Sequence, residues 1–373
     1  MPNLIDPVEL ASALIAVPSV TPATGAVFDV LEEALTPLGF AIHRFTRGEP
    51  AVENMVAIRG EGGPHFGFAG HLDVVPPGDG WSGDPFVPRI EEGRLIGRGA
   101  NDMKSAIAAF VAAIPPIQDN GTQSLLITGD EEGPGAHGTV AIIDWLEERG
   151  IRPDFILIGE PTSETRLGDT VKIGRRGSVN MWIDVPGTQG HVAYPHKADN
   201  PIPALARLVC ALDAVHLDDG NEAFPPSNLE FTEVAVGEGA ANIIPGSASI
   251  RLNIRFNNMK RGADLVRMVE EIAAREAPGA KVRALISGEA FLTPPGHLYD
   301  LVVSAIREET GIAPELSTGG GTSDGRFLIK LCPVVDFGLP NATMHKLDES
   351  AAVEDIRQLA RIYGRVIAKA FGS

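Results

Sequence analysis

Short apolar segments alternate with helical patterns in the first half of the sequence, and this alternation constrains the fold more than any other feature. Three segments, 65–69, 124–128 and 155–158, are almost continuously apolar and are bounded by glycine or charged residues. This pattern is typical of strands buried on both faces of a largely parallel sheet. Helical spacing appears between them, at 103–114 and 139–149. The order of strands and helices therefore predicts an α/β fold with helices on both faces of the sheet.

A second domain is expected because 373 residues exceed what one ordinary core organises. After about residue 176 the apolar runs give way to polar/apolar alternation, which is typical of a sheet with one face in water. The patterns there follow the order strand, helix, strand, strand, helix, strand, which is ferredoxin-like. We predict a discontinuous domain with a mixed, mostly parallel sheet and flanking helices, formed by 1–176 and 290–373. An inserted ferredoxin-like α+β domain would span 177–289.

Charge and composition exclude several classes of partner. The formal net charge is −18 at pH 7, so the long-range field would repel nucleic acid and anionic membranes. The N-terminal segment has acidic residues in place of a basic region, and we expect a mature cytoplasmic protein without a membrane span. Cys210 and Cys332 lie in apolar stretches and are expected to be small core residues.

Acidic and imidazole side chains follow the predicted strands. In open α/β sheets ligands bind at the carboxyl ends of the strands, so these groups should meet at one edge. Clustered carboxylates repel each other unless positive charge lies among them, and imidazole with carboxylate suits zinc, cobalt or manganese. A lone histidine or acidic loop is more often a surface feature, but their coincidence predicts a pair of divalent metals. The residues are His71, Asp73, Asp102, Glu131, Glu132, Glu160 and His345.

Five segments, in order, give the chain a resemblance to the dinuclear zinc aminoacylase/carboxypeptidase family. They are GHLDVVP at 70–76, GRGANDMK at 97–104, GDEEG at 129–133, GEPTS at 159–163 and MHK at 344–346. Leu72 departs from the pattern, since many relatives carry a small hydroxyl residue there. Further segments are similar to the branch of the family that removes the succinyl group from N-succinyl-L,L-diaminopimelate in the synthesis of lysine and cell-wall precursors. These segments lie at 174–178, 189–200, 242–245 and 317–327.

The resemblance implies a set of protein ligands for each of two zinc ions. One ion would be held by His71 and Glu160, the other by Glu132 and His345, and Asp102 would bridge both. Five protein ligands over two ions leave positions open for water and substrate, which a catalytic zinc site requires. Cobalt or manganese are possible substitutes.

Three further residues receive catalytic roles from the resemblance. Asp73 would orient the imidazole of His71, although a helix or turn cap is the alternative. Glu131 would be the general base. His191 resembles the histidine that reaches into the active site of the opposite subunit, where it would stabilise the oxyanion. This implies a homodimer through the inserted domain; without the resemblance, His191 would be interpreted as a surface histidine.

The implied substrate is a small anion that enters an acidic protein, so arginine–carboxylate contacts are needed to hold it. The matching motif positions are Arg175, Ser178, Tyr194, Asn242, Arg255, Gly321, Thr322 and Asn341. Arg176, His137 and His196 receive no assigned role.

The metal site does not separate the members of the family from each other. An acetylornithine deacetylase or another N-acyl amino acid hydrolase is the nearest alternative to the succinyl-group hydrolase, because all share the same chemistry. A catalytically silent zinc-binding dimer is the non-enzymatic alternative. It is disfavoured because all five ligands, the base and Asp73 are present.

Overall fold

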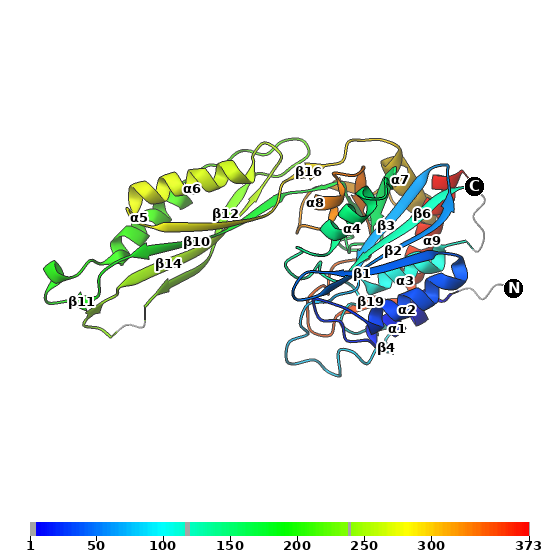
Figure 1. The fold of residues 1–373 in the computed structure, drawn as a ribbon, viewed down its shortest axis with the longest axis horizontal. Coiled ribbons are helices and arrows are strands. Elements are labelled where there is room, and N and C mark those ends of the chain that lie inside the picture. Colours follow the sequence, from blue (N-terminus) through cyan, green and yellow to red (C-terminus); the bar gives the residue numbers. More distant parts are fainter. Residues whose placement is uncertain (1–4, 116–119, 238–239, 373) are drawn as a thin grey trace. The chain divides into compact units, whose positions relative to one another are not determined.

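The computed structural model describes residues 5–115, 120–237 and 240–372 (Figure 1). The chain divides into two compact units. Unit 1 comprises Met1–Ile173, Thr293–Ser317 and Ser323–Ser373, and unit 2 comprises Gly174–Leu292 and Thr318–Thr322. The short segment 318–322, which the sequence patterns placed in the discontinuous domain, groups with unit 2.

Unit 1 is built on an eight-stranded sheet. In spatial order the strands are β1 (Ala41–Arg47), β2 (Val52–Glu61), β6 (Gly121–Thr128), β3 (His65–His71), β7 (Phe155–Ile158), β18 (Val334–Asp336), β8 (Thr170–Lys172) and β17 (Glu315–Ser317). The central strands β6, β3, β7 and β18 run parallel to one another, whereas at one edge β2 is antiparallel to both β6 and β1. The predicted mixed, mostly parallel sheet is confirmed.

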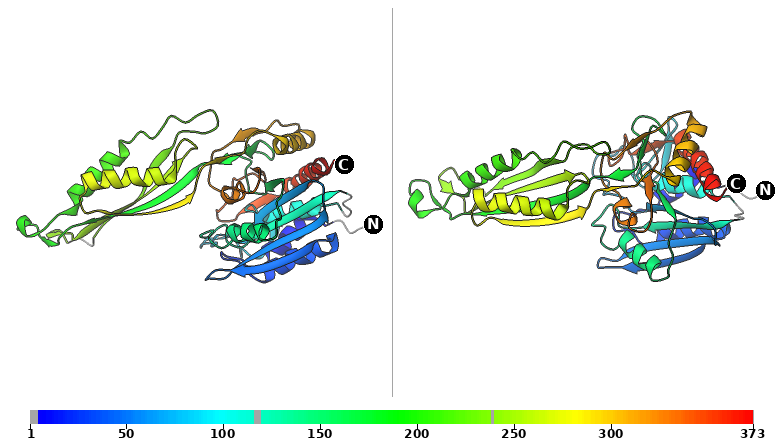
Figure 2. Two further views of the ribbon diagram at one scale, coloured as in Figure 1. Left: turned by 45° about the horizontal axis from the view of Figure 1, so that its top comes forward. Right: turned by 90° about the horizontal axis from the view of Figure 1, so that it is seen from above.

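Helices cover both faces of this sheet (Figure 2). The elements of unit 1 outside the sheet are α1 (Pro7–Ile15), α2 (Ala26–Leu35), η1 (Thr36–Leu38), α3 (Lys104–Ala113), α4 (Thr139–Glu147), α7 (His297–Thr310), α8 (Gly325–Leu328), α9 (Val353–Phe371) and a small sheet of β4 (Arg89–Glu91), β5 (Arg94–Ile96) and β19 (Ser350–Ala352). Helix α3 packs against α1 and α9, and α4 packs against β2 and β6.

The apolar core of unit 1 lies between the sheet and the α3–α9 layer. Phe68 of β3 stacks on Phe110 of α3 with 4.0 Å between ring centroids. Tyr363 of α9 meets both rings edge-on, and its hydroxyl donates to the carbonyl oxygen of Phe337 at 2.7 Å. Phe68, Phe110 and Tyr363 are all fully buried. This packing fixes the strand ends that carry the functional residues.

Unit 2 contains a four-stranded antiparallel sheet in the order β12 (Asn228–Val236), β14 (Ser247–Phe256), β10 (Gly177–Pro186) and β15 (Lys281–Gly288). Helices α5 (Pro201–Asp213) and α6 (Gly262–Glu276) lie side by side on one face of it. Alternate β14 residues, from Ala248 to Phe256, are buried beneath them. The chain order with this sheet order is ferredoxin-like, as predicted. The remaining elements are β9 (Gly174–Arg175), β11 (Gly190–His191), η2 (Pro195–Lys197), β13 (Ile243–Ile244) and β16 (Phe291–Leu292).

The prediction that both cysteines are core residues is wrong for Cys210. Cys332 is buried, but Cys210 is exposed. Helix α5 buries Leu205, Leu208 and Leu212. Position 210 follows Leu208 by two residues, which turns its side chain about 200° around the helix and away from the core. Among the described residues, no helix has the length and apolar character needed to span a membrane.

Candidate metal centre

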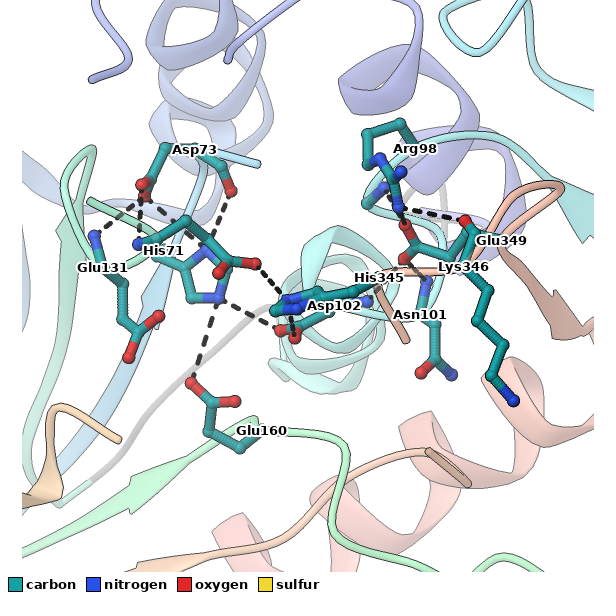
Figure 3. Close-up of polar contacts among 12 residues, drawn as sticks. His71, Asp73, Arg98, Asn101, Asp102, Glu131, Glu160, His345, Lys346 and Glu349 are labelled. Atoms are coloured by element: carbon teal, nitrogen blue, oxygen red, sulfur yellow. Dashed lines mark hydrogen bonds and ion pairs between the residues drawn. The ribbon is translucent and has the colours of Figure 1, made fainter. Parts of the chain in front are cut away.

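Neighbouring parallel strands bring the predicted ligands to one edge of the sheet in unit 1. Strand β3 ends at His71, and its parallel neighbour β6 ends at Thr128, just before Glu131 and Glu132. Strand β7, parallel to β3 on the other side, ends two residues before Glu160. Figure 3 shows the side chains converging there. The arrangement follows from topology, because parallel strands present their carboxyl ends together.

Asp102 lies between two histidines. Its Oδ1 is 3.2 Å from Nε2 of His71, and its Oδ2 is 3.4 Å from Nε2 of His345 (Figure 3). Both carboxylate oxygens are therefore directed at nitrogens that can act as metal ligands. This is the geometry of a carboxylate that can bridge two metal positions.

Two more carboxylates complete the two halves of the centre. Oε1 of Glu160 is 3.9 Å from Nε2 of His71, and Oε1 of Glu132 is 2.9 Å from Nε2 of His345. One half therefore contains His71 and Glu160, the other contains Glu132 and His345, and Asp102 is common to both. We call these the strand-end half and the loop half.

The donor set fits divalent cations. Nδ1 of His71 is 2.9 Å from the backbone carbonyl oxygen of Asp73, so Nδ1 is the protonated nitrogen. In the neutral imidazole, Nε2 then presents a lone pair to the Asp102 carboxylate, and two electron-rich atoms face each other at 3.2 Å. Only a proton or a metal ion between them relieves this repulsion, and imidazole with carboxylate is the ligand chemistry of zinc.

The pKa values of the metal-free chain also indicate that positive charge is stabilised among these carboxylates. Hydrogen bonds with Asp102 and Glu132 raise the pKa of His345 to about 10. Although burial opposes it, the two histidines hold the pKa of Asp102 well below its usual range. Protons on the imidazoles thus supply the charge that the carboxylates require, and a divalent cation can supply it in their place.

Asp73 fixes the loop that follows β6. Its side chain is fully buried, and its two carboxylate oxygens accept hydrogen bonds from the backbone N–H groups of Glu131 at 3.2 Å and Glu132 at 2.9 Å. Oδ1 of Asp73 is 3.6 Å from Nδ1 of His71, farther than the backbone carbonyl oxygen of the same residue. Asp73 therefore contacts the imidazole through its backbone and the loop through its carboxylate.

Glu131 is half-buried beside the centre. One carboxylate oxygen lies within 4.8 Å of the ligand atoms of His71 and Glu160, so the geometry alone also permits Glu131 as a ligand. Burial, and after it the neighbouring carboxylate of Asp324, raise the pKa of Glu131 to about 8. A cation at the centre would lower this pKa again, because it opposes the charge of the carboxylates.

The proposed substrate contacts are, with one exception, in unit 2. Nη1 of Arg175 donates to the carbonyl oxygen of Gly321 at 3.0 Å, and Ser178 is paired across the sheet with Arg255. Thr322 and Asn242 also belong to this unit. The exception is Asn341 in unit 1, whose backbone N–H donates to the carbonyl oxygen of Ser163 at 2.9 Å.

His191 lies in a small two-stranded antiparallel sheet of unit 2, in which β11 pairs with β13. Its side chain is exposed, and its Nδ1 accepts the backbone N–H of Ala193 at 3.0 Å. The ring of Tyr194 is 5.8 Å away, centroid to centroid. Arg176, which the sequence left without a role, donates to Oδ1 of Asn228 at 2.8 Å.

Comparison with known proteins identifies the family. The sequence profile of peptidase family M20/M25/M40 matches residues 67–369, which include all seven predicted residues of the centre. The chain belongs to this family. The resemblance inferred from the motifs is thereby confirmed.

Relatives within the family resemble the chain over its full length. The chain is 63% identical to the succinyl-diaminopimelate desuccinylase of Sphingopyxis alaskensis, with 100% of both chains covered. It is 62% identical to the enzyme of the same name from Rhizorhabdus wittichii, with 98% of each covered. A family M20 metallo-carboxypeptidase from Sulfolobus solfataricus has the same fold, with a TM-score of 0.82 at 16% identity and coverage of 98% and 99%.

Three residues of the centre's surroundings were missed by the sequence analysis. Arg98 and Asp324 lie inside quoted motifs, and this was their only signal. Glu349 lies four residues after His345 and carried none. In the structure Arg98 and Glu349 form a fully buried ion pair beside the centre, and Asp324 is buried near Glu131.

Proposed function

We propose that this chain is a two-metal amidohydrolase that cleaves N-succinyl-L,L-diaminopimelate to succinate and L,L-diaminopimelate. The observation that carries the two-metal part is Asp102, whose two carboxylate oxygens face the two histidines at 3.2 and 3.4 Å. The substrate part is supported by full-length relatives that bear the desuccinylase name at 63% and 62% identity. The product would serve the synthesis of lysine and cell-wall precursors.

Two zinc ions per subunit, or cobalt or manganese in their place, would be held by the strand-end and loop halves with Asp102 shared. Bound there, such ions supply Lewis acidity that activates water and polarises the amide carbonyl. The residues of the chain then position the reactants. The strand-end half is the more buried, with His71 only 1% exposed.

Glu131 is the proposed general base. The Asp73 carboxylate fixes the backbone of Glu131 and of its neighbour Glu132, and the Glu131 carboxylate lies beside His71 and Glu160. Glu131 would take a proton from the attacking water and deliver it to the amide nitrogen as the C–N bond breaks. Proton transfer of this kind contributes about 10²–10⁴-fold to the rate.

We further propose that the chain acts as a homodimer through the ferredoxin-like unit, with His191 donating to the oxyanion in the partner's site. The support is local: at and next to the two-stranded sheet that carries His191, three large apolar or aromatic side chains are exposed, those of Val192, Tyr194 and Ile243. A cluster of this kind is characteristic of interaction surfaces. Mixing inactive His191→Ala and inactive Glu131→Ala subunits should restore partial activity, and no recovery would contradict the role in trans.

The anionic substrate would be bound by Arg175, Arg255 and the polar groups around them. Arginine pairs with carboxylates in a planar, bidentate way, which suits a substrate with three carboxylates in an acidic protein. The remaining proposed contacts are Ser178, Tyr194, Asn242, Gly321, Thr322 and Asn341. Both cysteines are free, which suits a reducing compartment, and we propose the cytoplasm.

The decisive experiment compares succinate release from N-succinyl-L,L-diaminopimelate with acetate release from N-acetylornithine by the zinc-loaded protein. Rapid release of succinate alone supports the proposal. Release of acetate alone moves the assignment to an N-acetyl amino acid hydrolase. Zinc binding without either reaction favours the silent-dimer alternative.

A variant tests the role of Glu131 in the same assay. Glu131→Gln should lower kcat by about 10²–10⁴-fold while the zinc content stays that of the wild type. Glu309→Gln is the matched control, because Glu309 of α7 is a mostly buried carboxylate that pairs with Arg361 and Arg365 of α9 and is not among the residues of the centre. Activity in Glu131→Gln equal to that of the control would contradict the assignment.

A further inference from the structure

A buried ion pair between Arg98 and Glu349 connects the loop that carries Asp102 to the loop that carries His345. Nη1 of Arg98 is 2.9 Å from Oε2 of Glu349, and the two residues are 2% and 1% exposed (Figure 3). Neither residue is among the proposed ligands or reacting groups. Burying two charges is costly unless every contact is used, so such a pair needs a structural or functional reason.

Glu349 holds the loop of Asp102 by its backbone. Oε1 of Glu349 accepts the backbone N–H groups of Asn101 at 2.7 Å and Asp102 at 2.9 Å. Oε2 accepts the backbone N–H of Gly99 at 2.9 Å, besides the guanidinium of Arg98. One carboxylate thus receives four hydrogen bonds from the segment that ends at the bridging ligand.

Arg98 ties the same segment to the loop of His345. Its Nη1 also donates to the carbonyl oxygen of Lys346 at 3.2 Å, the residue after His345. Its Nη2 donates to the carbonyl oxygen of Pro77 at 3.0 Å, in the loop that follows His71 and Asp73. Its guanidinium lies 5.0 Å from the ring centre of Trp81. Three loops around the centre therefore meet at one side chain.

Strand pairing supports both loops from outside. Ile96 of β5, six residues before Asp102, pairs with Ser350 of β19, five residues after His345. The ion pair lies between this strand pairing and the ligands. Along the chain, Arg98 stands between Ile96 and Asp102, and Glu349 stands between His345 and Ser350.

The two halves of the centre depend on this support unequally. His71 ends a buried strand and its Nδ1 is fixed by Asp73. His345 lies in a loop, is 45% exposed at its side chain, and adopts the left-handed backbone conformation with φ of 60°. A non-glycine residue keeps such a conformation only where the surroundings enforce it.

We propose that Arg98 and Glu349 are positioning residues that set the separation of Asp102 and His345, and thereby the affinity of the loop half for its metal ion. This rests on the proposed two-metal site. Outer contacts of this kind commonly change metal affinity by about 10–100-fold.

Glu349→Gln is the primary test. Glutamine keeps the shape but replaces one acceptor oxygen by an NH₂ group. Because both oxygens accept backbone N–H groups, either orientation of the amide sets donor against donor. Zinc titration by calorimetry should then show the weaker binding step lowered by about 10–100-fold, with the stronger step within about threefold of the wild type. A His345→Ala titration identifies the step that belongs to the loop half.

Arg98→Lys provides a second variant that keeps the charge, and it should weaken the same step because a single ammonium does not reach all three acceptors. Glu309→Gln is the control for loss of one paired carboxylate, and should leave both steps unchanged. The absorption spectrum of the cobalt-loaded protein gives an independent reading of the loop-half geometry. It should change in Glu349→Gln and Arg98→Lys but not in the control.

The outcomes are distinct. If Glu349→Gln folds and both zinc-binding steps are unchanged, the proposal is overturned. It is also overturned if both steps are weakened equally and the melting temperature falls, because that result indicates a purely structural role. If Glu349→Gln does not fold, the same criteria applied to Arg98→Lys decide. Wild-type protein that takes up fewer than two ions overturns the two-metal function itself, and the positioning role with it.

Discussion

Replacing Asp73 by asparagine tests how the chain holds its centre together. The side chain is fully buried, and its two oxygens accept the backbone N–H groups of Glu131 and Glu132 at 3.2 and 2.9 Å. Asparagine has the same shape but only one acceptor oxygen, so in either orientation one buried N–H faces an NH₂ group. An unsatisfied buried donor costs about 1–3 kcal/mol. For a domain of about 150–250 residues, this corresponds to a melting temperature lower by roughly 2–12 °C.

The functional loss should exceed what this instability explains. The carboxylate and backbone of Asp73 jointly fix the Glu131–Glu132 loop and the His71 ring, so both halves of the centre lose orientation. We expect zinc affinity to fall by about 10–100-fold, as for other contacts behind metal ligands. Competition with a chelator of known affinity measures this directly, and kcat at saturating zinc shows whether Glu131 is still in place.

Asp169→Asn is the matched control for this prediction. Asp169 also accepts backbone N–H groups of a loop, those of residues 164–166 at 2.8 to 3.0 Å, and it lies in the same unit. The control should lower the melting temperature and leave zinc affinity unchanged. If Asp73→Asn lowers only the melting temperature, as the control does, the reasoning about Asp73 is refuted.

Two further predictions concern the scaffold. Phe110→Ala should lower the free energy of unfolding by about 3–5 kcal/mol, because a fully buried ring stacked on Phe68 is replaced by a cavity. Urea unfolding measures this loss, and a loss below about 1 kcal/mol would contradict the packing described. Burial acts to raise the pKa of Asp169, but the backbone N–H groups of residues 164–166 hold it below its usual value. The contribution of the Asp169 carboxylate to the free energy of unfolding is therefore fully present above the unfolded pKa of about 3.9. It is lost as the pH falls through the pKa of the folded protein. The difference in unfolding free energy between wild type and Asp169→Asn should shrink from pH 6 to pH 3, and a constant difference would contradict this.

The sequence predicted the fold well where one physical rule decided the pattern. Strands β3, β6 and β7 were found because burial on both faces leaves an almost continuous apolar run. The alternation in β14 likewise indicated one buried face. The antiparallel edge strands β1 and β2 were not assigned. β1 is mostly exposed, so burial imposed no pattern on it that could be recognised.

The sequence could not predict contacts that join distant positions through the backbone. Glu349 accepts the N–H of Asp102 from 247 residues away, and this hydrogen bond uses no side chain of the segment it holds. A pattern search finds residue types and spacings, and a backbone donor has neither. The exposure of Cys210 shows the opposite error, because an apolar neighbourhood in sequence was taken for an apolar environment in space.

The same distinction separates the two halves of the metal centre. His71 is the last residue of a buried strand and Glu160 comes two residues after another, so the rule that ligands gather at the carboxyl ends of parallel strands predicted their positions without any resemblance. His345 lies nine residues after the end of β18, with a backbone conformation that no strand rule provides, and its pairing with Glu132 was implied only by the motifs. No sequence pattern indicated what holds the loop of His345 in place; in the structure, Arg98 and Glu349 hold it. The residues hardest to predict are thus the ones on which the loop half depends.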